Sequence, residues 1–208
     1  PQYRVLKNFF SIAFKNNLRY PIVGFIDTIK EFSREKIQEF LENYYTRENI
    51  YLVLAGDFSS IDLTSKLEEY FGCEVKKGRK NKPKDSETDF SPLKNELIEK
   101  KEVSQAHLVF GFKSPSRYSS DKYVFRIISA ILGQGMASRL FLEIREKRGW
   151  AYYVSTSYDL FEDIGLFYVR SGVGNKRNII QDTLKIIKNE LYSLLESVSE
   201  SDLIRAKE

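Results

Sequence analysis

The sequence predicts an α+β fold, in which an antiparallel sheet carries helices packed on one face. Two aromatic-rich runs, 151–158 and 164–171, flank the polar turn 159–163, which is typical of two strands that pair antiparallel. Apolar residues recur at helical spacing before this pair, in 120–133, and after it, in 180–195. Strands accompanied by helices on one side indicate an α+β architecture.

The first part of the chain contains three predicted helices and one predicted strand. Residues 1–14 and 63–71 are expected to be helical, and a further helix, 33–45, begins with Ser33 as its N-cap. Between them, 50–55 is a continuous apolar run of strand length. A strand of this composition is expected to be covered on both faces.

The second part contains a meander of strands and helices. Residues 97–101 and 105–112 are expected to form neighbouring strands, and 137–148 a short helix that Gly149 ends. The last segment begins with a capping-box variant at Ser199 and stops after about two turns. Such a short amphipathic helix has little to pack against, which suggests a truncated chain.

A basic stretch divides the chain. Residues 76–84 hold most of the excess positive charge, but glycine, asparagine and proline interrupt the run, and no aromatic residue precedes Phe90. A solvated linker is therefore favoured over a nucleic-acid site. We expect 1–75 to be the C-terminal part of one α+β domain, 76–94 to be a linker, and 95–208 to be most of a second domain.

Composition excludes several classes of protein. The chain has 208 residues, a net charge of +4, no apolar run long enough to cross a bilayer and no signal-peptide pattern. It lacks an initiator Met, which suggests a piece of a longer protein. The single cysteine, Cys73, excludes an intrachain disulfide and suits a reducing, cytoplasmic compartment. The single histidine, His107, has no nearby partner and is a poor metal candidate.

The stretch 133–172, GQGMASRLFLEIREKRGWAYYVSTSYDLFEDIGLFYVRSG, resembles the second domain of the pitrilysin/insulinase family of zinc metallopeptidases, particularly the bacterial proteases similar to mitochondrial processing peptidase. The stretch 32–59 resembles the end of that family's first, zinc-carrying domain. The resemblance covers nearly the whole chain, and the order and spacing of the segments carry it. It implies duplicated metallopeptidase-like domains, of which the second lacks the metal.

The same resemblance implies where zinc is bound. The family motif H-x-x-E-H needs two histidines, and this chain has one. The ligands, with a further glutamate, are therefore expected upstream of Pro1, so that the parent protein holds zinc and this chain holds no metal. Alone, the chain is expected to be inactive.

Arg145 and Tyr152 are the candidate catalytic residues. Family members place an arginine and a tyrosine seven positions apart opposite the zinc, and these two residues have that spacing. By resemblance, they would donate hydrogen bonds to the scissile carbonyl or to the bound peptide backbone. The alternative is structural: Arg145 would favour its helix C-terminus and pair with Glu146, and Tyr152 would be one more aromatic residue of the sheet.

Gly133, Gly135 and Met136 are candidate substrate-binding residues, because a relative of the family carries a glycine-rich loop there that touches substrate. The loop lacks the Lys-Ser/Thr of a phosphate cradle. The alternative is a simple turn between two helices.

Two hypotheses follow. In the first, the chain is the metal-free region of a zinc endopeptidase that processes peptides or presequences, and it acts within a homodimer or beside a partner peptidase subunit. In the second, the parent is a non-catalytic homologue that serves as a peptide-binding or structural partner. A peptide is the expected ligand in both, and neither a nucleic acid nor a membrane is an expected partner.

Overall fold

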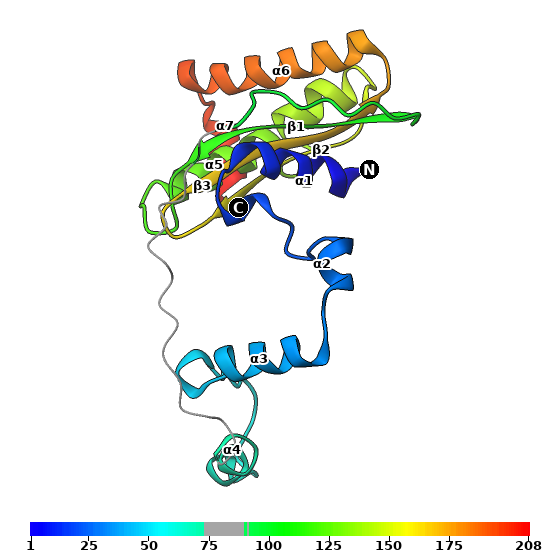
Figure 1. Ribbon diagram of the computed structural model, residues 1–208. Coiled ribbons are helices and arrows are strands. Elements are labelled where there is room, and N and C mark those ends of the chain that lie inside the picture. The colour runs from blue at the N-terminus through cyan, green and yellow to red at the C-terminus, as the bar shows by residue number, and fades with distance from the viewer. Residues whose placement is uncertain (73–89, 91) are drawn as a thin grey trace. The chain divides into compact units, whose positions relative to one another are not determined.

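The computed structural model describes residues 1–72, 90 and 92–208. These residues form two separate units, one of 1–21 with 87–208 and one of 22–86 (Figure 1). The first unit contains α1 (Gln2–Ala13), a 3-10 turn (Asn17–Arg19), β1 (Gln105–Ser114), α5 (Lys122–Gly133), a π-helix (Phe141–Glu146), β2 (Ala151–Leu160), β3 (Gly165–Gly174), α6 (Arg177–Glu196) and α7 (Glu200–Lys207). The second unit contains α2 (Ile26–Lys30), α3 (Arg34–Tyr44), a 3-10 turn (Arg47–Asn49) and α4 (Leu63–Phe71).

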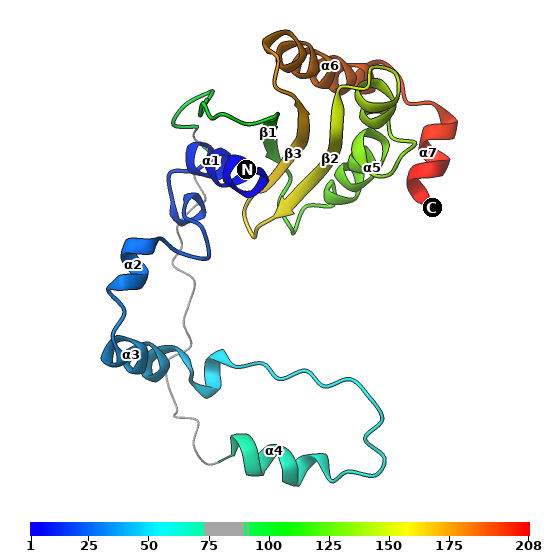
Figure 2. The ribbon, with the colours of Figure 1, turned by 90° about the vertical axis from the view of Figure 1, so that its right-hand side faces the viewer.

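The first unit is built on a three-stranded antiparallel sheet with the strand order β1-β3-β2. Strands β2 and β3 form the predicted antiparallel pair, so that prediction is confirmed. Strand β1 joins the other edge of β3 over ten residues. The predicted α+β fold is thereby confirmed. In Figure 2, α5 and α1 lie on opposite sides of the sheet.

The main hydrophobic core lies between one face of the sheet and three helical segments. Alternate residues of β3, among them Phe167, Val169 and Val173, are buried there against α5, the π-helix and α6. Phe167 has no exposed surface and stacks on Phe112 with the ring centroids 5.2 Å apart. Alternation along each strand sends these side chains to one face because successive residues point to opposite sides.

Helix α1 covers part of the opposite face. The rings of Phe9 and Phe10 lie against Tyr168, at centroid distances of 5.9 and 6.3 Å, and Phe14 is fully buried beside Leu166. Residues 1–21 therefore belong with the sheet, whereas the sequence placed them in the preceding domain. The apolar side of α1 explains this position, because it supplies the second, smaller hydrophobic core.

The predicted strand 97–101 does not form. Side-chain contacts to α1 hold this segment instead: Glu99 Oε2 accepts hydrogen bonds from Arg4 Nε at 2.6 Å and from Asn8 Nδ2 at 3.1 Å. The segment has no regular secondary structure and joins no ladder in the described part of the chain.

The last predicted helix does pack, contrary to expectation. Ser199 caps α7 by accepting a hydrogen bond from the Asp202 backbone N–H at 3.1 Å, as the sequence predicts. The helix lies against α5. The Arg139 side chain, described below, also bonds to α7 and to α6.

In the second unit, α3 and α4 lie where the sequence predicts helices, α2 was not predicted, and the predicted strand is absent from the described residues. Ser33 caps α3, accepting from the Lys36 N–H at 3.4 Å. Residues 50–55 are extended and exposed, with 77% of Tyr51 and 87% of Val53 accessible to solvent. A strand needs a neighbour to pair its backbone and cover its faces, and no described residue of this unit supplies one. The prediction of a covered strand is wrong for this chain.

Cys73 and most of the predicted linker, 76–94, lie outside the described residues. Among the described helices, none combines the length and the apolar character needed to cross a bilayer.

Candidate functional site

The segment that carries Arg145 is a π-helix, where the sequence predicted an ordinary short helix. The Lys147 N–H donates to the Leu142 carbonyl at 2.9 Å, five residues back, which widens the turn. Phe141 and Ile144 are buried in the main core and fix the inner side of this segment. Arg145 follows on the outer side and is exposed. Single π-turns inside helices are frequent at functional sites.

Arg145 is held by two contacts. Its guanidinium carbon lies 5.0 Å from the centre of the Phe141 ring, and its Nη1 donates to the Tyr152 carbonyl at 3.1 Å. The neighbouring carboxylate of Glu143 pairs with Lys147 and Arg148. No ion pair joins Arg145 to Glu146 within the described residues. Arg145 thus keeps donors available on its outer side.

Tyr152 sits in a β-bulge, which the sequence did not predict. In the register of β2 and β3, Ala151 lies opposite Val173 and Tyr153 lies opposite Gly172, so that Tyr152 is the extra residue. A bulge re-aims a side chain out of the regular alternation, and such bulges are frequent next to active sites. The Tyr152 side chain is 60% exposed, unlike the buried aromatic residues of the sheet. The structure therefore brings Arg145 to the backbone of Tyr152 at an exposed position.

The glycine loop joins α5 to the π-helix, as the simple-turn alternative requires. Gly133 is buried, and a Cβ there would lie 2.7 Å from the Thr156 backbone nitrogen. Gly135 has a positive φ of 81°, a conformation that favours glycine. Met136 is 76% exposed. Of the three candidate substrate-binding residues, Gly135 and Met136 are available to a ligand, and Gly133 sets the close approach of the loop to the sheet.

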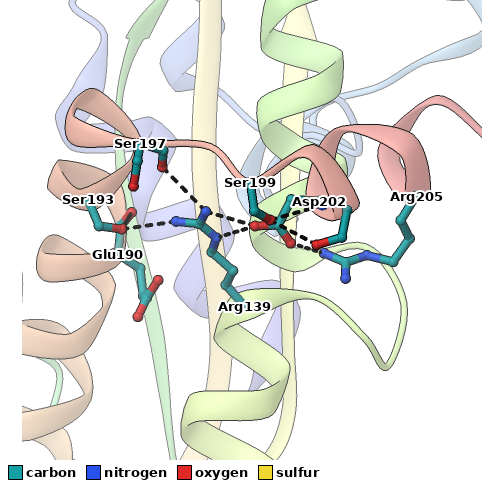
Figure 3. Close-up of polar contacts among 8 residues, drawn as sticks. Arg139, Glu190, Ser193, Ser197, Ser199, Asp202 and Arg205 are labelled. Carbon is teal, nitrogen blue, oxygen red and sulfur yellow. Dashed lines mark hydrogen bonds and ion pairs between the residues drawn. The ribbon is translucent and has the colours of Figure 1, made fainter.

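Arg139 connects the start of the π-helix to the C-terminal helices (Figure 3). Its Nε and Nη2 donate to Asp202 Oδ2 at 3.0 and 2.8 Å, and its Nη1 donates to Ser193 Oγ at 3.1 Å. The two charged side chains are only 19% and 14% exposed. Arg205 also donates to Asp202, through Oδ1 at 2.6 Å. This cluster fixes the segment that precedes Arg145.

Replacing Arg139 by Met is expected to cost about 2 kcal/mol of unfolding free energy, between the values for exposed and fully buried ion pairs. The reason is that Asp202 would keep its partly buried charge but lose two of its hydrogen bonds. Urea denaturation measures the loss. Arg205→Met is the matched control, because Arg205 is 38% exposed and its removal leaves the Arg139 contacts in place. Equal losses for the two variants would contradict this assignment.

The described residues hold no zinc site. No three side chains of the types His, Cys, Asp and Glu come together among them in a way that could ligate a metal. His107 contacts Tyr153 instead, with Nδ1 3.1 Å from the tyrosine hydroxyl. The donor set in this part of the chain does not fit zinc.

Comparison with known proteins identifies the family. The sequence model of the family described as "Peptidase M16 inactive domain" matches residues 31–208. The chain belongs to the peptidase M16 family. It is 30% identical over 213 residues to an uncharacterized zinc protease of Rickettsia felis, with 100% of this chain and 49% of that protein covered. It is also 31% identical over 183 residues to the uncharacterized zinc protease YmxG of Bacillus subtilis, with 84% and 43% covered.

Solved structures show the same fold. A protease from Helicobacter pylori superimposes with a TM-score of 0.81 at 22% identity, covering 100% of this chain and 50% of that one. An M16 inactive domain from Pseudomonas fluorescens superimposes with a TM-score of 0.79 at 21% identity, with the same coverage. The M16 chain spans about half the length of the curated relatives and solved chains that it matches.

Proposed function

We propose that this M16 chain is the metal-free, substrate-binding region of a zinc-dependent endopeptidase. The observation that carries the proposal is the joining of Arg145 to Tyr152 at an exposed bulge. Its relatives are named zinc proteases, and its own described residues do not fit zinc. The metal would therefore be held by another part of the parent protein, opposite this region.

In this proposal, Arg145 and Tyr152 bind the backbone of a peptide. Arg145 donates one N–H group to the Tyr152 carbonyl, and its other guanidinium N–H groups remain available to a peptide carbonyl. The exposed Tyr152 hydroxyl adds a second donor. Donors fixed before the reaction stabilise the negative charge that develops on a carbonyl oxygen as it is attacked. The Phe141 ring and the bulge supply this fixation.

The glycine loop would extend the same surface. Gly135 offers backbone close to an approaching peptide, and Met136 offers a flexible apolar side chain. A facing half that carries the zinc is needed to close the site. We propose that this half comes from the rest of the parent or from a second copy of it, with Arg145 and Tyr152 acting in trans in the second case.

Two measurements test the proposal. The 208-residue chain is expected to bind no stoichiometric zinc and to cleave no peptide, whereas the full-length parent is expected to cleave unstructured peptides and to lose this activity when zinc is chelated. Metal analysis and a quenched-fluorescence peptide assay give the two results. One tightly bound zinc per 208-residue chain would refute the division of roles, and a zinc-free, inactive parent would refute the peptidase itself.

A further inference from the structure

The sheet face that α1 partly covers carries a row of polar side chains next to that helix. His107, Gly172 and Tyr153 lie opposite one another across the three strands, and Arg170 and Ser155 lie in the adjacent row. All the polar members are partly exposed. We refer to His107, Tyr153 and Arg170 together as the polar sheet face.

Gly172 allows His107 and Tyr153 to meet over the central strand. A Cβ at Gly172 would lie 2.4 Å from the Tyr153 ring, so that a larger residue would displace the ring. The two rings lie 6.0 Å apart at 26°, and the tyrosine hydroxyl is 3.1 Å from His107 Nδ1. Burial lowers the pKa of His107, which favours the neutral imidazole. In the tautomer that carries the proton on Nδ1, His107 donates to the tyrosine oxygen and leaves the tyrosine O–H free to donate.

Arg170 supplies the positive charge and is incompletely bonded. Its Nε is buried and has no hydrogen-bond partner among the described residues. Its Nη2 donates to Ser157 Oγ at 3.4 Å, beyond the usual range, and its guanidinium carbon lies 6.0 Å from the Tyr168 ring centre. The Arg170 side chain is partly exposed, so the guanidinium N–H groups other than Nε are the donors available to an anionic ligand.

The carboxylate on the same face is engaged elsewhere. Asp159 lies in the row after Tyr168, and its Oδ2 accepts from the Tyr168 hydroxyl at 3.3 Å. In the described part of the chain no ion pair joins Arg170 to an acidic side chain. Hydrogen bonds to carboxylates of the described residues therefore do not occupy the Arg170 guanidinium.

We propose that the polar sheet face binds a carboxylate group of a peptide, with Arg170 and Tyr153 as donors and His107 as the residue that orients the tyrosine hydroxyl. One guanidinium matches a single negative charge, whereas a phosphate dianion would require more cations. That the ligand is a peptide rests on the proposed function. The carboxylate belongs either to the C-terminus of the peptide or to an acidic side chain, since the chemistry is the same.

The test uses three ten-residue peptides that share a neutral core, titrated calorimetrically into the 208-residue chain. One ends in a free carboxylate, one carries a single Glu and a C-terminal amide, and one has no carboxylate. At least one carboxylate peptide is expected to bind about tenfold more tightly than the neutral peptide, as expected for a hydrogen bond to a charged group. Whichever carboxylate peptide binds more tightly shows whether the site takes a C-terminal carboxylate or an acidic side chain. Arg170→Gln should abolish the difference, and the exposed control Arg177→Gln should retain it.

A second variant protects the test against misfolding. Tyr153→Phe keeps the ring beside Gly172 but removes the donor, and it should reduce the carboxylate preference about threefold or more. Equal binding of all three peptides would overturn the carboxylate site while leaving peptide binding, and the proposed function, intact. Equal losses of the carboxylate preference in Arg170→Gln and Arg177→Gln would also overturn the carboxylate site. Binding of none of the peptides would overturn it too. The proposed function is tested separately, by peptide cleavage in the parent.

Discussion

Replacing Tyr152 by Phe in the full-length parent is expected to lower kcat about 10²–10³-fold, the effect of removing one donor from a site that stabilises developing negative charge. The variant loses only the hydroxyl, while the ring and the backbone carbonyl that receives Arg145 Nη1 stay in place. Because the side chain is 60% exposed, the free energy of unfolding should change little. Steady-state kinetics with a quenched peptide, together with urea denaturation, give the two quantities.

Tyr192→Phe is the matched control, since Tyr192 is 67% exposed on α6 and lies outside the bulge and the glycine loop. It should leave kcat unchanged. If Tyr152→Phe left the turnover of the parent unchanged, Tyr152 would be a surface aromatic residue with no role in the reaction. A fall in both kcat and stability would instead indicate that the hydroxyl supports the bulge.

Phe167→Ala is expected to cost about 3–5 kcal/mol of unfolding free energy, the range for removing a large aromatic side chain from a core. Phe167 has no exposed surface, stacks on Phe112 and meets Phe125 edge-on at 6.0 Å. Its removal would leave a cavity where β1, β3 and α5 converge. The urea midpoint, with an unchanged slope, measures the loss.

The control for this variant is Phe32→Ala, because Phe32 is 61% exposed. Its substitution should change the free energy of unfolding by less than about 0.5 kcal/mol, the usual range for surface changes. If Phe167→Ala shifted the midpoint no more than this control, the main core described above would be wrong.

Local patterns in the sequence predict the elements that depend on neighbouring residues. The pairing of β2 with β3 follows from two aromatic runs and a short turn, and the caps at Ser33 and Ser199 follow from hydroxyl residues before helices. Two predictions that depend on distant residues were wrong. The segment 97–101 is held by α1 rather than by a strand, and 50–55 has no strand to pair with among the described residues.

The candidate site shows the same division. Arg145 and Tyr152 were predicted as candidates because their seven-residue spacing resembles that of the family. The π-turn and the bulge could not be predicted, because each is a local departure from regular pairing that depends on packing against the core. The polar sheet face was missed altogether. Only the register shows that Gly172 lies between His107 and Tyr153.

The exposed run 50–55 has a consequence for the behaviour of the protein in solution. Six consecutive residues, Ile-Tyr-Leu-Val-Leu-Ala, combine high β-propensity with no charge and no proline, and they offer unpaired backbone groups. Such a segment is a template to which another copy of the same segment can add as a strand, the first step of aggregation. We therefore expect the concentration at which this 208-residue chain stays dispersed to depend on residues that belong neither to the bulge at Tyr152 nor to the sheet.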